Sequence, residues 1–192
     1  MYWTICFLVN RLTEENPGPG VVAFRIIKDG GDNNMGAQYK AYYMSEIGTI
    51  EVVGRSDGII SVDFVEDAEA DNISAHDCLK PCMTQLDEYF CGKRKTFLVS
   101  FQIQGTEFNK KVWRALMDIP YGTTQSYSDI AKAIGHKNAY RAVGNANRNN
   151  KIAIIIPCHR VIGSDGSLTG YACGIWRKEW LLAHERKYLD SP

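Results

Sequence analysis

The sequence has no apolar run of the roughly 18 residues that a membrane-spanning helix requires, so we predict no transmembrane segment and no membrane partner. The apolar opening, residues 1–11, has no basic residue before it, and we expect a strand there rather than a secretion signal. No CxxC pair is present, and 192 residues are too many for a disulfide-stapled mini-protein. We therefore expect six reduced cysteines in an intracellular protein, cytoplasmic, or nuclear if the source is eukaryotic.

Net charge is also absent, because 22 basic residues balance 22 acidic ones, but the two signs are divided unevenly along the chain. Residues 1–105 carry 9 Lys and Arg against 15 Asp and Glu, whereas residues 106–192 carry 13 against 7. The second half, with its net charge of +6, is therefore the better candidate for a surface that binds a polyanion. Solvated charge that is segregated by chance would give the same count.

The spacing of apolar and turn residues divides the chain near residue 105. Residues 1–40 are rich in Gly, Pro, Asn and Asp, and we expect mostly loops there. We predict strands at residues 20–27, 42–44, 49–53 and 59–65, a helix at 78–90, and a strand or extended linker at 97–103. We predict further helices at residues 107–117, 126–134, 138–148 and 176–187. This pattern indicates an α/β domain over residues 1–105 and a mainly helical domain over residues 106–192.

Two short predicted helices, joined by Gly135-His136-Lys137, fit a helix-turn-helix. Ser126 is a candidate cap for the first of them, with Asp129 three residues on. The second helix, YRAVGNANRNN, is rich in small residues and carries two arginines. A helix of this kind can lie close to a partner surface, although packing of its small face on a neighbouring helix is an equally physical reading.

The segment Ile156-Pro157-Cys158-His159-Arg160 ends an apolar run and contains a candidate nucleophile. A thiol attacks as the thiolate, which neighbouring cationic and donor groups favour. His159 and Arg160 are such groups, and Glu185 is a candidate for orienting the imidazole. Spacing alone does not show that His159 and Glu185 meet, and the same residues would suit a Cys-His hydrolase.

Several ordered segments closely resemble the O6-alkylguanine-DNA alkyltransferases, also called methylated-DNA–protein cysteine methyltransferases. They are Phe108 with Val112-Trp113, IPYGTTQSYSDIA (119–131), RAVGNANRNN (141–150), IPCHRVIGSDGSLTGY (156–171) and KEWLLAHE (178–185). The resemblance is strong over residues 108–187, weak over 40–105 and slight before residue 40. It implies a ribonuclease H-like α/β domain followed by a mainly helical domain with the helix-turn-helix.

The resemblance implies a role for each residue of a catalytic set. Cys158 accepts the alkyl group, and His159, oriented by Glu185, helps to remove the thiol proton through a water molecule. Asn150 braces the hinge between the recognition helix and the active-site loop. Tyr127 donates to the guanine and helps to rotate the nucleotide outward.

The resemblance also implies a set of residues that contact the lesion and the DNA. Arg141 enters the base stack, Tyr171 donates to the departing guanine, and the backbone near Val161 and Ala172 bonds the base edge. The full set is Tyr127, Arg141, Ala142, Gly144, Arg148, Arg160, Val161, Tyr171 and Ala172.

The activity implied is a single-turnover, suicide methyltransferase that repairs O6-alkylguanine in double-stranded DNA, with base flipping through the minor groove. No cofactor is implied, and we expect a monomer; activity on O4-alkylthymine and cooperative binding to DNA stay open. The alternatives are a lesion-sensing helix-turn-helix protein that binds DNA without chemistry, and the Cys-His hydrolase.

Two groups of residues remain outside these functions. The cluster of His76, Cys78, Cys82 and Cys91 matches no zinc-ligand pattern, so we predict no metal site. Trp113, Trp176 and Trp180 are expected to fill the core.

Overall fold

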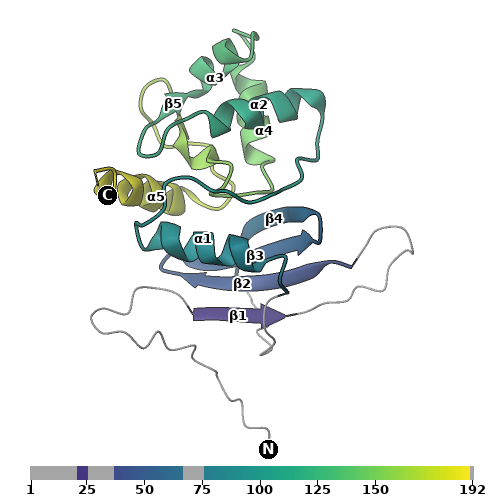
Figure 1. The fold of residues 1–192 in the computed structure, drawn as a ribbon. Helices are drawn as coiled ribbons and strands as arrows, with labels where there is room; N and C mark the ends of the chain where they lie inside the picture. The colour runs from purple at the N-terminus through teal and green to yellow at the C-terminus, as the bar shows by residue number, and fades with distance from the viewer. Residues whose placement is uncertain (1–20, 26–36, 67–75, 191–192) are drawn as a thin grey trace, which may run out of the picture. The chain divides into compact units, whose positions relative to one another are not determined.

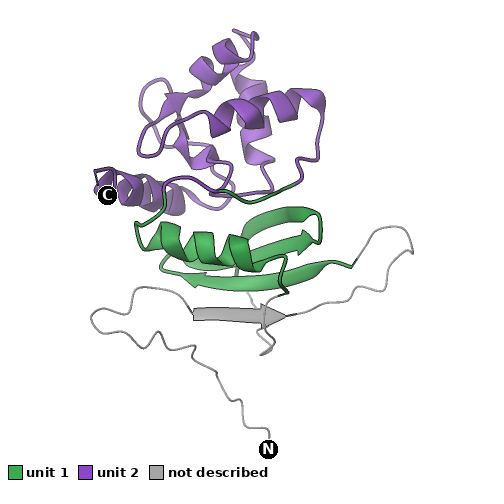
Figure 2. Ribbon diagram, viewed as in Figure 1, with its two compact units in different colours: residues 1–94, 98–101 green, residues 95–97, 102–192 purple. Residues whose placement is uncertain are grey.

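The computed structural model describes residues 37–66 and 76–190, and the backbone of residues 21–25. The chain forms two compact units (Figures 1 and 2). The first unit runs to Arg94 and includes Leu98–Phe101, and the second comprises Lys95–Phe97 and the residues from Gln102 onward. The strand expected at residues 1–11 lies outside the described residues.

An antiparallel sheet with strand order β1-β2-β3-β4 forms the first unit (Figure 1). Its strands are β1 (Val21–Arg25), β2 (Tyr39–Ser45), β3 (Gly48–Arg55) and β4 (Gly58–Val65). The helix α1 (Lys80–Phe90) packs on the sheet, where the rings of Tyr43 and Phe90 stack with their centroids 5.4 Å apart. The strands predicted at residues 20–27, 42–44, 49–53 and 59–65 are confirmed, and residues 97–103 form the extended linker rather than a strand. The helix predicted at residues 78–90 begins two residues later than expected, with a proline in its first turn, where no backbone donor is needed.

The second unit contains four α-helices in its described residues: α2 (Glu107–Met117), α3 (Tyr127–Ala133), α4 (Tyr140–Arg148) and α5 (Ile175–Lys187). All four predicted helices are confirmed. Two short strands, β5 (Gln125–Ser126) and β6 (Val161–Ile162), pair in parallel, and the 3-10 turn η1 (Cys158–Arg160) directly precedes β6. A two-residue strand has no periodicity, so the sequence could not reveal this pairing.

The helix-turn-helix is fixed by its caps and by a buried tryptophan. Ser126 Oγ accepts from the amide of Asp129 at 3.1 Å, and the Asp129 carboxylate accepts in return from the Ser126 amide, which completes the predicted capping box. Gly135, with a φ of 80°, ends α3 in the left-handed region. Trp113 Nε1 on α2 donates to the carbonyl of Ala146 on α4 at 2.8 Å. Trp113 is buried as expected, whereas Trp176 is 53% exposed, so its assignment to the core was wrong.

Loss of the capping box should weaken the helix-turn-helix. Replacing Ser126 with alanine leaves the Asp129 amide without its side-chain acceptor, and we expect the free energy of unfolding to fall by about 1 kcal/mol. Urea denaturation followed by circular dichroism measures the change. Ser128→Ala in the same helix removes a hydroxyl that is not at the cap, and equal losses in the two variants would contradict the prediction.

Candidate active site

A buried turn delivers the chain to Cys158. Residues 152–156 are all buried, and Ile154 has a φ of 69°, a left-handed backbone conformation that β-branched residues rarely adopt. Asn150 holds this turn at both ends, because its Oδ1 accepts from the Ile152 amide at 3.0 Å and its Nδ2 donates to the Ile156 carbonyl at 2.9 Å. The unfavourable backbone at Ile154 is therefore maintained by a side chain at the end of the recognition helix.

Cys158 is the first residue of η1 and is only 5% exposed. Asn150 Nδ2 lies 3.1 Å from its sulfur and donates to it, and Asn147 Nδ2 donates to its carbonyl at 3.2 Å. Asn147 belongs to α4, and Asn150 follows it closely in the chain. The predicted nucleophile is thus hydrogen-bonded once by the helix predicted to contact DNA and once by the segment that directly follows it.

His159 and Glu185 meet, although 26 residues separate them in the sequence. His159 Nε2 lies 2.8 Å from Glu185 Oε1, and both side chains are fully buried. An ionised carboxylate only accepts hydrogen bonds, so Nε2 carries the proton and Nδ1 keeps its lone pair. Nδ1 is itself buried and has no hydrogen-bond partner among the described residues. The pair therefore presents one unused basic nitrogen.

Arg160 neutralises the same carboxylate. Its Nε donates to Glu185 Oε2 at 2.9 Å, one terminal nitrogen donates to Oε1 at 2.9 Å, and the other donates to the Ile119 carbonyl at 2.7 Å. The Gly122 amide donates to Oε2 at 3.0 Å. Burial opposes the ionisation of Glu185, but His159 and Arg160 outweigh it and hold the pKa of the carboxyl well below its usual range.

Burial sets the charge of His159. Removal of the imidazole from water lowers its pKa below the ordinary value of 6.5, and the Arg160 and Lys178 charges act in the same direction, against the opposing effect of Glu185. His159 is consequently a neutral imidazole at neutral pH, which is the form that can accept a proton.

Lys178 is a residue of this site that the sequence analysis missed. It is fully buried on α5, and burial lowers its pKa from 10.5 to about 8, against an opposing effect of Cys158. Its ammonium group donates to the carbonyls of Val161 and Thr169. A signal was present in the sequence, since Lys178 lies on the same helix face as the buried residues Leu181, Leu182 and Glu185.

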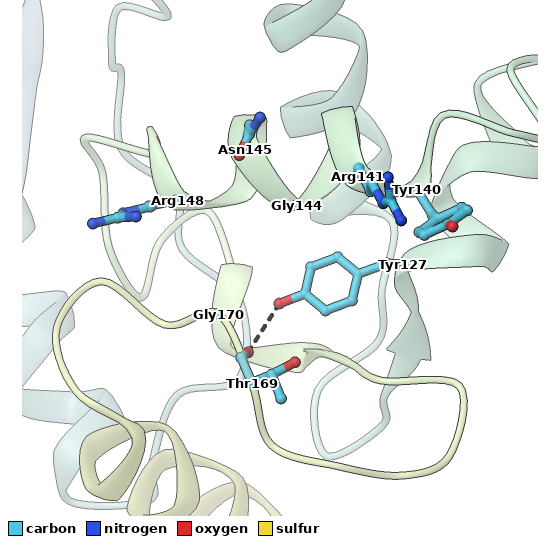
Figure 3. Close-up of a pocket in the computed structure, with 8 residues that line it drawn as sticks. All are labelled: Tyr127, Tyr140, Arg141, Gly144, Asn145, Arg148, Thr169 and Gly170. Carbon is cyan, nitrogen blue, oxygen red and sulfur yellow. Dashed lines mark hydrogen bonds between the residues drawn. The ribbon is translucent and has the colours of Figure 1, made fainter.

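A pocket of about 520 Å³ lies between the recognition helix α4 and the loop before Tyr171 (Figure 3). Its lining residues are Tyr127, Tyr140, Arg141, Gly144, Asn145, Arg148, Thr169 and Gly170. Cys158 is not one of them. Tyr127 points at the loop, and its hydroxyl donates to the Thr169 carbonyl at 2.9 Å (Figure 3).

Comparison with known proteins shows the family. A family model described as 6-O-methylguanine DNA methyltransferase, ribonuclease-like domain, matches residues 38–103, and one described as the DNA binding domain of the same family matches residues 107–187. The chain belongs to the 6-O-methylguanine DNA methyltransferase family. A methylated-DNA–protein-cysteine methyltransferase of Methanosarcina barkeri is 48% identical over 150 residues, which cover 76% of this chain and 95% of that protein.

Shorter and structural matches agree with this family assignment. The Mycobacterium tuberculosis protein of the same name is 55% identical over 102 residues, covering 53% of this chain and 62% of that protein. The crystal structure of Mycobacterium tuberculosis OGT in complex with DNA matches with a TM-score of 0.70 and 41% identity, covering 77% of this chain and 92% of that one. The predicted fold class, an α/β domain followed by a mainly helical one, is confirmed.

The recognition helix of this methyltransferase-family chain divides its small residues between two sides. Val143 and Ala146 are buried, so packing on neighbouring helices accounts for that part of the pattern. Arg141, Ala142 and Arg148 are exposed, and Gly144 is half-buried beside the Tyr127 ring, 3.9 Å from where its Cβ would lie. The exposed side carries three of the residues predicted to contact DNA.

The remaining predicted contact residues have different surroundings. Val161 and Tyr171 are buried next to the active-site turn and loop, and Ala172 is exposed. Arg160 was predicted to contact substrate or DNA, but it is buried, and its guanidinium is engaged by Glu185 and Ile119. We therefore correct its role to that of a buried partner of Glu185.

The other cysteines that the structure describes are Cys78, Cys82, Cys91 and Cys173. In residues 37–66 and 76–190, no group of three or more His, Cys, Asp or Glu side chains is arranged to hold a metal ion. His76 Nδ1 lies 3.1 Å from Cys78 Sγ, and Cys82 is buried in α1.

No helix in the described part of the chain is long and apolar enough to span a membrane.

The Glu185 cluster should impose a specific pH dependence on stability. Glu185→Gln leaves Arg160 buried without its counter-charge, and we expect a loss of about 3–5 kcal/mol at pH 7. The folded-state pKa of Glu185 is lowered, so its contribution is complete above the unfolded value of 4.5 and is lost as the pH falls below it. The difference in free energy of unfolding between wild type and Glu185→Gln should therefore become smaller as the pH falls below 4.5.

Urea unfolding at neutral pH and at two acidic pH values tests this expectation. Glu179→Gln changes an exposed carboxyl on the same helix and serves as the matched control. A gap between wild type and Glu185→Gln that stays constant at all pH values would contradict the assignment of an ionised, paired Glu185.

Proposed function

We propose that this protein repairs alkylated DNA by direct transfer of the alkyl group from guanine O6 to the sulfur of Cys158. The chain belongs to the 6-O-methylguanine DNA methyltransferase family, and its relatives over most of the chain are named methylated-DNA–protein-cysteine methyltransferases, which supports direct alkyl-transfer repair. One arrangement carries the assignment to Cys158. Its sulfur accepts a hydrogen bond from Asn150, and the next residue, His159, is paired with the buried carboxylate of Glu185.

The transfer is a displacement at the alkyl carbon. His159 Nδ1 takes the proton from the Cys158 thiol through a bridging water, and Glu185 stabilises the imidazolium that forms. The sulfur then forms a bond to the alkyl carbon while the carbon–O6 bond breaks, and its electron pair returns to the guanine. Tyr127 donates a hydrogen bond to the extruded guanine, Tyr171 donates to the guanine as it departs, and the proton balance is completed from His159 through water.

Base extrusion is needed because the O6 atom lies inside the duplex and Cys158 is nearly buried. In this proposal α4 lies in the minor groove, where Ala142 and Gly144 allow close approach and Arg148 contacts phosphate. Arg141 fills the gap left in the stack. The pocket beside Tyr127 is where the nucleotide first leaves the duplex.

The protein acts once, because a thioether is not readily hydrolysed and no group in the described site would remove the alkyl group. Double-stranded DNA with O6-alkylguanine is the proposed partner, without sequence preference, since phosphate contacts carry no sequence information. The chemistry requires a reduced thiol, so we place the protein in a reducing intracellular compartment.

A single adduct on Cys158 is the first expected result. Incubation with an O6-methylguanine duplex should add one methyl group per protein molecule, located on Cys158 by peptide mass spectrometry. Cys158→Ser should bind the same duplex and acquire nothing. Product formed beyond one equivalent would indicate the hydrolase, and binding of the lesion with an unmodified, reduced Cys158 would indicate the sensor. An O4-methylthymine duplex in the same assay tests the second substrate.

The two arginines of α4 should have separable effects. Arg141→Ala should slow methyl transfer from duplex DNA by about 10- to 100-fold, because no side chain then replaces the extruded base, with little change on free O6-methylguanine. Arg148→Ala should weaken binding to damaged and undamaged duplex alike and reduce the salt slope by about 1. Rates and affinities are compared at several salt concentrations, and identical profiles for the two variants would contradict the proposed roles.

A further inference from the structure

The ammonium group of Lys178 joins two segments of the site that are separate in the sequence. One is Val161, in the strand that leaves the Cys158 turn, and the other is Thr169, in the loop that leads to Tyr171. Lys178 is 0% exposed, and a lysine is rarely buried to this extent unless its charge has partners. Three N–H donors allow one ammonium to hold two carbonyls at once.

The Thr169 carbonyl is a shared acceptor. It receives the Lys178 ammonium at 2.7 Å and the Tyr127 hydroxyl at 2.9 Å, which its two lone pairs permit. The adjacent Gly170, with a φ of 69°, lies so close that a Cβ there would be 2.6 Å from the Tyr127 oxygen. Lys178 and Tyr127 thus hold the same point of this loop from two elements, α5 and α3.

These two tethers differ in what happens when a guanine is bound. In the proposed function, the Tyr127 hydroxyl turns from Thr169 to the base, and the loop loses one of its two hydrogen bonds at this carbonyl. The Lys178 ammonium undergoes no such exchange in the proposed function, because it contacts no base and its second acceptor is Val161, which is buried in the strand that follows the Cys158 turn. Lys178 therefore remains as the tether of the loop during transfer.

We propose that Lys178 is a positioning residue that holds the Thr169–Tyr171 loop against the Cys158 turn while Tyr127 engages the flipped guanine. This inference rests on the proposed function and adds to it the group that keeps the base-binding loop in place. Without the tether, Tyr171 and the Val161 carbonyl lose their fixed separation, and a displacement of about 1 Å in such a site can reduce a rate by about 100-fold.

Single-turnover methyl transfer with Lys178→Met, Lys178→Arg and Lys187→Met tests the proposal. Methionine keeps an unbranched chain without a donor, arginine keeps a charged donor, and Lys187→Met removes an exposed lysine from the same helix as the matched control. We expect Lys178→Met to slow transfer from an O6-methylguanine duplex by about 10- to 100-fold, with affinity for undamaged duplex retained within about twofold. Arginine should recover most of the rate, and Lys187→Met should match wild type.

Hydrogen exchange measured by mass spectrometry supplies a readout that does not depend on chemistry. In a Cys158→Ser background bound to the lesion duplex, Lys178→Met should speed the exchange of amides in residues 164–174 and leave those of α2 unchanged. An unchanged transfer rate would overturn the proposal, as would a slow rate with unchanged exchange in that loop. A loss of affinity of Lys178→Met for undamaged DNA as large as its loss of transfer rate would also overturn the proposal, since that result indicates a general packing defect. If wild-type protein acquires no methyl group, the proposed function fails, while the exchange result still decides the tether.

Discussion

The buried carboxylate of Glu185 accepts hydrogen bonds from three residues in two segments: His159 and Arg160 in η1 and the Gly122 amide in the turn after α2. A single buried anion on α5 thereby fixes both the turn that bears Cys158 and the start of the segment that leads into β5 and Tyr127. The same anion sets the tautomer of His159. Removal of the Glu185 charge would disturb both the placement of the Cys158 turn and the protonation of His159. The orientation of the His159 imidazole and the neutralisation of the Arg160 charge both depend on this carboxylate.

A second constraint couples DNA recognition to the nucleophile. Asn147 lies on the buried side of α4 and donates to the Cys158 carbonyl, while the exposed side of the same helix presents Arg141 and Arg148. Asn150 then holds the Ile152–Ile156 turn, including the left-handed Ile154. In the proposed function, DNA binds the exposed side of α4, and the opposite side of the same helix is hydrogen-bonded to the turn that bears the thiol.

The sequence predicted the helices well because their apolar residues recur at helical spacing and their ends carry Ser126, Gly135 and similar signals. The meeting of His159 with Glu185 could not be derived from spacing, since it depends on how α5 packs against η1; it was expected only through the family resemblance. Arg160 was misplaced for a related reason. The sequence placed Arg160 among the residues that contact the lesion and the DNA, and only the fold shows that its guanidinium is turned to a buried carboxylate.

Lys178 was not singled out from the sequence, because a charged residue on a helix is usually solvated. Burial of Glu185, Arg160 and Lys178 in one small region costs desolvation energy that apolar residues of similar volume would avoid, so stability alone does not explain the cluster. Each of these charges instead holds a polar group of the proposed site: Glu185 holds the imidazole of His159, Arg160 holds the Glu185 carboxylate, and Lys178 holds the carbonyls of Val161 and Thr169. The energetic cost of the cluster is therefore itself an argument for its function, independent of the motif around Cys158.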